Sequence, residues 1–247
     1  FKKDFGKGER LMKKICLIDY DMSVTGGVEQ VTASLANALA DFYEVHLISL
    51  SLEGMPAYNI DDRVIFKSFL TAPKRLREMQ RELCQEIRLY FREHDISVAL
   101  LQGNYVGFIL APTRFWSETK LVFCNHGALM NQWKQKDIVF IQLFSSILCH
   151  HVVTLTERNC ADYRKRFFLP GKKVSPIYNW LEDDVACSSE YKKDAKQIIS
   201  AGRFGKEKGF DQLIKAFAPV AKRHPDWSLT IFGDGEMLET VKSLVKE

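Results

Sequence analysis

Cationic side chains and glycines stand together late in this sequence. Arg203 and Lys208 lie five residues apart in a loop with flanking glycines. A guanidinium binds phosphate oxygens as a planar fork and an ammonium acts as a point charge, so this loop is suited to a diphosphate. A solvated basic loop explains the same two residues and is favoured while they are considered alone.

Gly26 and Gly27 form a second candidate contact to a phosphate. They stand between an apolar run and a helical pattern, and the exposed N–H groups of a helix start attract anions. A plain tight turn explains the same glycines. Neither the G-x-G-x-x-G nor the Walker A pattern is complete anywhere in the chain. Gly233 belongs to another strand-to-helix turn of low specificity.

His126 ends an apolar run and is followed by glycine, a position at which it would face a ligand. A lone histidine is more often a structural hydrogen-bonding group. Asp19 and Asp21 resemble a D-x-D metal motif, but paired carboxylates beside a glycine turn would repel a phosphate. We therefore interpret them as a strand end and a loop. No Cys or carboxylate cluster completes a metal site around His150-His151, and no metal is expected.

Alternating apolar runs and amphipathic patterns must position these residues. Such an alternation predicts a doubly wound parallel sheet in an α/β fold, with the ligand at the carboxyl edge of the strands. Strands are expected at residues 14–19, 45–50, 64–69, 96–102, 121–125 and 151–155. Helices are expected from residue 28 and over residues 74–93, 105–115, 137–149 and 158–168.

The same rhythm restarts after about residue 176. Strands are expected at residues 197–201 and 229–232, and helices at residues 210–222 and 235–245. Two strands fall short of the usual ~4–6, so we expect an incomplete second domain with exposed apolar surface, or a partner that covers it. Residues 1–11 precede Met12 and are excluded as a remnant or a trimmed extension.

The composition is that of an ordinary globular chain. Of 247 residues, 46% are hydrophobic and 27% charged, which excludes disorder and collagen. The apolar runs are too short to span a bilayer. The six cysteines form no C-x-x-C pair, so a zinc knuckle is not indicated and a reducing cytoplasm is expected. A net charge of +4 permits an anionic ligand, and no nucleic-acid partner is expected.

One predicted helix, residues 74–93, separates its charges. At about 100° per residue its cations fall within roughly a 60° arc beside an apolar face. Such segregation is compatible with an anionic membrane surface, and an ordinary solvated face is the alternative. The cations are Lys74, Arg77, Arg81, Arg88 and Arg92.

The order of these motifs is more specific than any one of them. From Met12 onward the chain resembles the family 4 retaining glycosyltransferases, which have the two-domain GT-B fold. The likeness is strongest over residues 197–235. It rests on Gly26–Glu29, His126-Gly127, Thr154–Glu157, Ile177–Asn179, Ser200–Gly209 and Phe232–Gly235.

This resemblance implies two Rossmann-like domains: residues 12–175 on the acceptor side, and residues 176–247 as the incomplete start of a nucleotide-sugar-binding domain. It implies that Gly26, Gly27 and Gly233 approach the donor. Arg203 and Lys208 would bind the donor and neutralise the leaving diphosphate without a metal or other cofactor. His126 would face the donor sugar.

The implied activity is a hexosyl-type transfer, with retention, from a nucleotide sugar to a carbohydrate or lipid-linked acceptor, in the cytoplasm or at the inner membrane face. The family's E-x7-E motif is missing from its expected place; Glu239 and Glu247 have that spacing too early in the domain. We therefore expect a truncated chain whose own activity is in question. A catalytically silent GT-B-like scaffold is the alternative. A nicotinamide dehydrogenase is disfavoured because the glycine fingerprint is missing.

Overall fold

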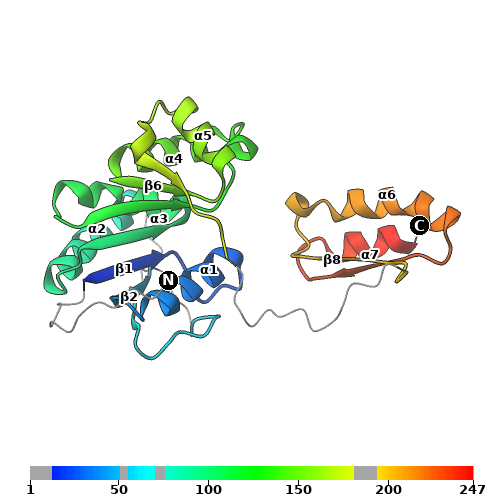
Figure 1. Ribbon diagram of the computed structural model, residues 1–247, viewed down its shortest axis with the longest axis horizontal. Helices are drawn as coiled ribbons and strands as arrows, with labels where there is room; N and C mark the ends of the chain where they lie inside the picture. The colour runs from blue at the N-terminus through cyan, green and yellow to red at the C-terminus, as the bar shows by residue number, and fades with distance from the viewer. Residues whose placement is uncertain (1–12, 51–54, 70–75, 181–193, 247) are drawn as a thin grey trace. The chain divides into compact units, whose positions relative to one another are not determined.

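The computed structural model describes residues 13–50, 55–69, 76–180 and 194–246. The chain divides into two compact units, residues 1–180 and 181–247, each described here by itself (Figure 1). The sequence places a boundary near residue 176, and the last strand of the first unit ends at Pro176. The expected remnant at residues 1–11 and Lys74 lie outside the described residues.

The first unit is built on one parallel sheet with helices on both faces. Its described strands are β1 (Lys14–Asp19), β2 (Glu44–Ser49), β3 (Ile65–Ser68), β4 (Val98–Gln102), β5 (Lys120–Asn125), β6 (His151–Thr154) and β7 (Val174–Pro176). Their order in the sheet is β3-β2-β1-β4-β5-β6-β7, with every pairing parallel. The predicted doubly wound α/β sheet is thus confirmed.

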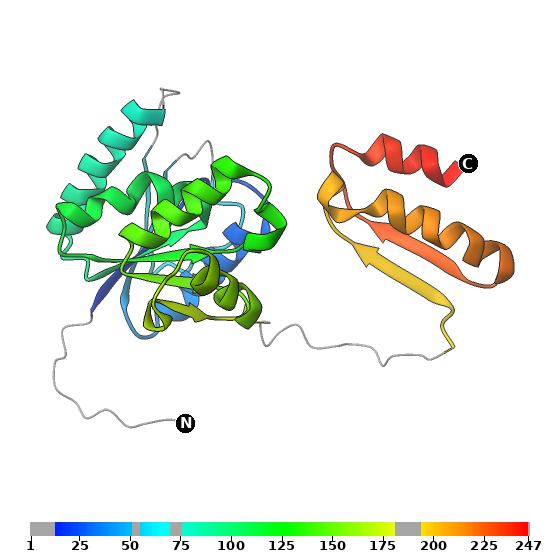
Figure 2. The ribbon, with the colours of Figure 1, turned by 90° about the horizontal axis from the view of Figure 1, so that it is seen from above.

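Helices and short 3-10 turns join these strands. The α-helices are α1 (Gly27–Leu39), α2 (Leu76–Glu93), α3 (Gly103–Leu110), α4 (Lys136–Leu148) and α5 (Glu157–Arg166). The 3-10 turns are η1 (Ala111–Phe115), η2 (Leu129–Gln132) and η3 (Gly171–Lys173). In Figure 2 the teal and green helices α2, α3 and α4 form a layer over the sheet.

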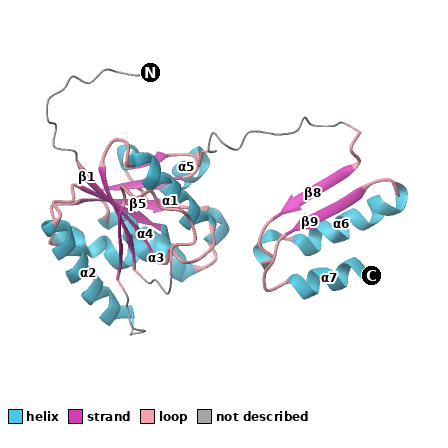
Figure 3. Ribbon diagram, turned by 90° about the horizontal axis from the view of Figure 1, so that it is seen from below, coloured by secondary structure: helices cyan, strands magenta, loops and turns pink. Residues whose placement is uncertain are grey.

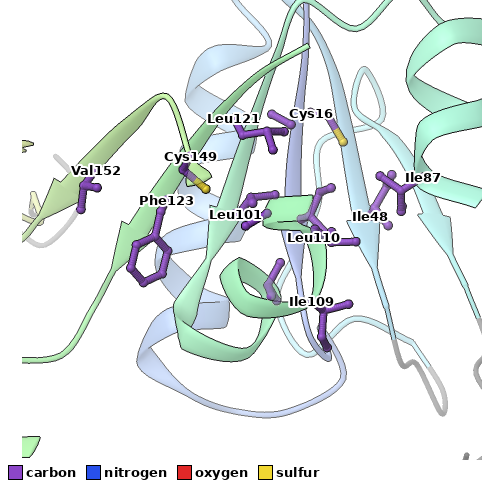
Figure 4. Close-up of a cluster of buried hydrophobic side chains, with 14 of the residues drawn as sticks. Cys16, Ile48, Ile87, Leu101, Ile109, Leu110, Leu121, Phe123, Cys149 and Val152 are labelled. Atoms are coloured by element: carbon purple, nitrogen blue, oxygen red, sulfur yellow. The ribbon is translucent and has the colours of Figure 1, made fainter. Parts of the chain in front are cut away.

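Two apolar cores hold these layers together. Ala33 and Ala36 of α1 pack with Leu47 on one face of the sheet. The larger core on the other face joins α2, α3 and α5 to the central strands, and Figure 4 shows part of it, including Leu101 and Phe123. The strands are buried from both sides, which explains their continuous apolar runs. The five cysteines within the described residues are free and buried, as expected.

Three differences from the sequence prediction have local causes. The helix expected at residues 105–115 is divided into α3 and η1, because Pro112 lacks the N–H that an α-helix needs. The helix expected from residue 235 begins three residues later, at Leu238. Strand β7 was not predicted, because its three residues include a proline and show no apolar run.

The second unit contains two parallel strands, β8 (Gln197–Ala201) and β9 (Ser228–Phe232), within its described residues. Helices α6 (Phe210–Arg223) and α7 (Leu238–Lys246) and the 3-10 turn η4 (Lys206–Lys208) complete it (Figure 3). Only Phe204, Phe210 and Val241 form its buried apolar core among these residues. Ile199 and Phe232 are 62% and 57% exposed, which confirms the expected exposed apolar surface.

Candidate functional site

The carboxyl edge of the first sheet is the natural place for a ligand. The strand order reverses between β1 and β4, and doubly wound sheets bind ligands beyond the carboxyl ends of the strands at that point. Asp19 ends β1 and Gln102 ends β4. The Gly26-Gly27 turn follows β1, and His126 follows β5, the neighbour of β4. The first-unit candidate residues therefore lie on loops of one sheet edge.

The glycine turn opens α1 as predicted. Gly26 is the N-cap residue and has no side-chain cap, and Tyr58 Oη donates to its carbonyl oxygen at 3.0 Å. A Cβ at Gly26 would lie 2.2 Å from Glu29 Oε2, so the Glu29 carboxylate folds over this glycine. A Cβ at Gly27 would meet nothing within 4 Å. The open side of the helix start is therefore at Gly27.

Asp19 is a buried carboxyl group at this edge. It is 2% exposed, and Thr32 Oγ1 lies 2.8 Å both from its Oδ2 and from the carbonyl oxygen of Val28. The Thr32 hydroxyl can donate to either oxygen. Burial raises the pKa of Asp19 to about 6, so the carboxyl is protonated and can donate to Thr32 below that pH, and is mostly ionised and accepts from Thr32 at neutral pH.

His126 is a neutral imidazole held by the neighbouring strand. Its Nε2 lies 2.8 Å from Gln102 Oε1, and burial lowers its pKa to about 4. With the amide oxygen assigned as the acceptor, Nε2 carries the hydrogen and Nδ1 is left as an acceptor. The side chain therefore offers a hydrogen-bond acceptor at Nδ1.

Two asparagines fix the backbone that follows His126. Asn125 Oδ1 accepts from Gly127 N at 2.9 Å. Asn159 Nδ2 donates to Gly127 O, and Asn159 Oδ1 accepts from Leu129 N, both at 2.9 Å. Thr156 caps α5 by accepting from Asn159 N at 3.1 Å, which holds Asn159 in place. This loop is therefore tied to β5 and α5.

A buried polar chain extends from the loop into α4. Gln142 is fully buried, and its Nε2 donates to Gln132 Oε1 at 2.6 Å and to Asn104 Oδ1 at 3.3 Å. Asn104 Oδ1 also accepts from Asn125 Nδ2 at 2.7 Å. These hydrogen bonds join the loop to α3 and α4, although the buried Gln142 Oε1 has no hydrogen-bond partner among the described residues.

In the second unit, the loops after β8 and β9 pack against each other. Gly202 N donates to Phe232 O at 2.9 Å, and Phe204 N donates to Asp234 O at 2.8 Å. Gly233 has φ +155°, and a Cβ there would lie 1.9 Å from Gly202 O. Only glycine permits this close approach. Gly233 thus shapes the loop that carries Arg203.

The two candidate cations lie at this carboxyl edge. Arg203 follows β8, Lys208 ends η4, and both residues are exposed. The Cδ of Lys208 lies 4.0 Å from where a Cβ on Gly202 would be, so the lysine stem passes beside the same loop. Arg203, Lys208 and Gly233 are therefore gathered by one pair of strands. Gly26, Gly27 and His126 belong to the first unit.

The other sequence candidates have structural partners. Asp21 accepts from Ser23 N at 2.9 Å and Ser23 Oγ at 2.6 Å. His150 Nδ1 accepts from Leu121 N at 3.1 Å, and His151 Nε2 lies 3.0 Å from Ser175 Oγ. Among the described residues, no group of three or more His, Cys, Asp or Glu side chains is placed to hold a metal ion.

Sequence reasoning missed the residues that position His126. Gln102 and Asn125 each end an apolar run at the carboxyl edge, which is the signal that identified His126 itself. Asn159 lies on the first turn of α5 and carries no such signal. Its role depends on a partner 32 residues away in sequence, Gly127, and that pairing requires the fold.

Helix α2 combines a buried and an exposed face. Its apolar residues Leu83, Ile87 and Phe91 are buried in the first-unit core. These three apolar side chains are therefore part of the core and are not available to a membrane surface. Arg81 and Arg88 are exposed, so the cationic face is available.

Comparison with known families gives matches to both units. A model described as Glycosyltransferase Family 4 matches residues 25–185. A second, described as Glycosyl transferases group 1, matches residues 186–247. Together the two models extend from the Gly26 turn to the end of the chain.

Curated relatives agree with these matches. An uncharacterized glycosyltransferase of Haemophilus influenzae is 25% identical over 95% of this chain and 66% of its own length. The Campylobacter jejuni N-acetylgalactosamine-N,N'-diacetylbacillosaminyl-diphospho-undecaprenol 4-alpha-N-acetylgalactosaminyltransferase is 24% identical over 96% of this chain and 67% of its own length. This chain thus spans about two thirds of such relatives.

Solved structures share the fold at low identity. Anabaena Alr3699/HepE, in complex with UDP and glucose, aligns with TM-score 0.68 and 14% identity over 95% of this chain and 65% of its own. The lipopolysaccharide outer core galactosyltransferase WaaB aligns with TM-score 0.65 and 12% identity over 94% of this chain and 64% of its own. These likenesses confirm the GT-B-like fold class, with only part of the second domain in this chain.

Proposed function

Because this chain belongs to glycosyltransferase family 4, we propose that the protein transfers a sugar from a nucleotide-sugar donor to a carbohydrate or lipid-linked acceptor. The observation that carries the proposal is the pair of interlocked loops after β8 and β9, where Arg203 and Lys208 stand at a carboxyl edge. Cations at such an edge suit the diphosphate of the donor.

In the proposed reaction, the bond between the anomeric carbon and the diphosphate oxygen breaks and negative charge develops on that oxygen. Arg203 and Lys208 neutralise this charge, so the proposal requires neither a metal nor another cofactor. The acceptor hydroxyl oxygen bonds to the anomeric carbon on the face that the diphosphate leaves, which retains the configuration. The hydroxyl proton passes to the leaving diphosphate.

By the resemblance to the family, the first unit is proposed to offer the donor uncharged contacts. The N–H groups at the start of α1 approach the diphosphate from the open side at Gly27, where no atom lies within 4 Å of a Cβ position. His126 Nδ1 accepts a hydrogen bond from a hydroxyl of the donor sugar. The pKa of His126, lowered to about 4, keeps the ring neutral at physiological pH, so the ring carries no positive charge that would attract the diphosphate.

The relatives suggest the chemical classes of donor and acceptor. HepE is solved with UDP and with UDP-glucose, which supports a UDP-linked donor. The Campylobacter relative is named for a diphospho-undecaprenol substrate, and an Erwinia amylovora relative for amylovoran biosynthesis. We accordingly propose a UDP-hexose donor and a lipid-linked or polysaccharide acceptor.

Substitution of the cations tests the proposal in the full-length protein. Arg203→Ala or Lys208→Ala is expected to lower the rate of UDP release from a UDP-sugar by about 10²–10³, because a preorganised charge contact is lost. Lys222→Ala, an exposed lysine at the end of α6, is the matched control and should leave the rate unchanged. Near wild-type turnover in both variants would remove these cations from the mechanism. UDP binding without turnover with any acceptor would favour a silent scaffold.

We further propose that the protein works at the cytoplasmic face of the membrane. No helix within the described residues is both long and apolar enough to cross a bilayer. Each cation near an anionic surface contributes about 1 kcal/mol, screened by salt. Vesicles of anionic lipid should therefore bind the protein at low salt, and reversal of Arg77, Arg81 and Arg88 to Glu should weaken this binding. Vesicle binding that is equally strong at low and high salt, or that the triple reversal leaves unchanged, would contradict this location.

A further inference from the structure

A groove on the first unit has not been assigned a role. It lies between α2 and η1, has a volume of about 410 Å³, and is separate from the glycine turn and from His126. Gln80, Cys84, Arg81 and Arg88 line it from α2, and Pro112 and Trp116 line it from η1 and the residue that follows η1.

The floor of this groove is fixed by hydrogen bonds between helices. Gln80 Nε2 donates to Phe108 O at 3.0 Å, and Cys84 Sγ donates to Ile109 O at 3.1 Å. Cys84 is 8% exposed, so the floor is closed to solvent. The groove therefore has a rigid, mostly apolar base between α2 and α3.

The charges along the groove have one sign. Arg81 and Arg88 are seven residues apart, which places them on one side of α2 about 10 Å from each other along its axis. None of the described side chains that line the groove is acidic. At about 100° per residue, position 78, a glutamate, lies about 60° around the helix from Arg81, and the other three glutamates of α2 lie about 100–140° from it. Those three are Glu82, Glu86 and Glu93.

The wall opposite the arginines is apolar and exposed. Pro112 and Trp116 form this wall, and Trp116 is 60% exposed. An exposed indole ring beside arginines suits a ligand that is anionic at one end and apolar at the other. A free inorganic anion would gain no binding energy from this apolar wall.

We propose that the groove between α2 and η1 binds a lipid phosphate or diphosphate: Arg81 and Arg88 hold the phosphate oxygens, and Pro112 and Trp116 contact the first carbons of the lipid chain. This proposal rests on the proposed function only for the biological source of the lipid. It adds a second anion site, in the first unit, to the donor diphosphate loop of the second unit.

Binding of farnesyl diphosphate to the 247-residue chain tests the proposal. Below its micelle concentration, the probe should bind with a measurable dissociation constant and shift the indole N–H resonance of Trp116, assigned with Trp116→Phe. Arg81→Gln with Arg88→Gln should weaken binding by about tenfold or more, because charge-assisted hydrogen bonds are lost. Arg92→Gln with Lys120→Gln removes the same charge outside the groove and should leave binding unchanged.

A comparison of two probes distinguishes a lipid diphosphate from free diphosphate as the ligand of the groove. Inorganic diphosphate should bind at least about tenfold more weakly than farnesyl diphosphate, because it lacks the apolar contact. Equal binding of the two probes would overturn the lipid assignment in favour of a free diphosphate. No binding of farnesyl diphosphate, or binding that the Arg81 and Arg88 substitutions leave unchanged, would overturn the site.

A variant of the proposed donor site serves as a further control. Arg203→Ala with Lys208→Ala should abolish UDP binding and leave the Trp116 shift by farnesyl diphosphate intact. Loss of the Trp116 shift in this variant would mean that the probe occupies the donor loop, which would overturn the groove. Absence of UDP binding in the full-length protein would count against the proposed function and not against the groove.

Discussion

At the scale of single residues, Asp19 and His126 show opposite pKa shifts at one sheet edge for one reason. Burial disfavours the charged form of either group, which raises the pKa of Asp19 to about 6 and lowers that of His126 to about 4. His126 is therefore neutral at pH 7, whereas Asp19, with a pKa of about 6, is mostly ionised there and becomes neutral only in mildly acidic solution.

Asp19→Asn tests this burial through the free energy of unfolding. The pKa of Asp19 is raised above its unfolded value of about 3.9, so its contribution to stability is fully present below pH 4 and is lost as the pH rises through 6. The substituted amide does not titrate, and it still donates a hydrogen bond to Thr32. Relative to wild type, the variant should therefore gain about 2–3 kcal/mol between pH 4 and pH 8.

Urea unfolding at several pH values measures this difference. Asp62→Asn, at an exposed residue, is the matched control and should follow the wild-type pH dependence. If Asp19→Asn and wild type show parallel pH dependence, then burial does not raise the pKa of Asp19 in the folded protein.

The sequence identified the residues of this edge but not their partners. Gly26 and His126 were found because each follows an apolar run, and the end of a parallel strand is visible in sequence. The hydrogen bonds from His126 to Gln102 and from Asn159 to Gly127 join residues 24 and 32 positions apart. Such pairings depend on which strands and helices become neighbours, and local patterns carry no information about that.

At the scale of elements, long apolar runs were predicted well and short or interrupted ones were not. Strands β1, β4 and β5 are buried on both faces, so their sequences are continuously apolar. Strand β7 pairs with β6 through only Val174, Ser175 and Pro176. Its stability comes from that pairing and from α5, whose Arg164 donates to Val174 O at 2.6 Å, rather than from its own composition.

Two glycine substitutions distinguish a glycine that the fold requires from a glycine that a ligand requires. Gly233→Ala should destabilise the second unit by more than about 2 kcal/mol, because its Cβ would lie 1.9 Å from Gly202 O at a positive φ. Gly27→Ala should be neutral or stabilise α1 by about 0.5–1 kcal/mol, because its Cβ meets no atom within 4 Å. If Gly27 contacts the donor diphosphate, that variant should nevertheless lose donor turnover.

Thermal unfolding and UDP-sugar turnover of the full-length variants decide between these roles. A Gly27→Ala protein that is stable and fully active would show that this glycine forms a plain turn. A Gly233→Ala protein as stable as wild type would contradict the close approach of the β8 and β9 loops.

At the scale of the whole molecule, the two units differ in how completely they bury their sheets. The first unit covers a seven-stranded sheet on both faces within its described residues. In the described residues of the second unit, only Phe204, Phe210 and Val241 are buried apolar side chains, beside a cavity of about 730 Å³ between α6, α7 and the two strands. The chain also spans 66% of the length of its Haemophilus relative. The second unit is therefore where added chain or a partner would contribute most.

This difference in burial predicts which surface of the 247-residue chain drives self-association. Ile199 and Phe232, 62% and 57% exposed on neighbouring strands, form an apolar face on a parallel two-stranded sheet, and such faces drive self-association. Ile199→Thr with Phe232→Thr should lower concentration-dependent association in sedimentation velocity and reduce binding of an apolar dye. Phe42→Ser with Phe168→Ser, which removes two exposed rings of the first unit, should leave both readouts near wild type. A wild-type chain that is monomeric at high concentration and binds no dye would show that this face is already covered.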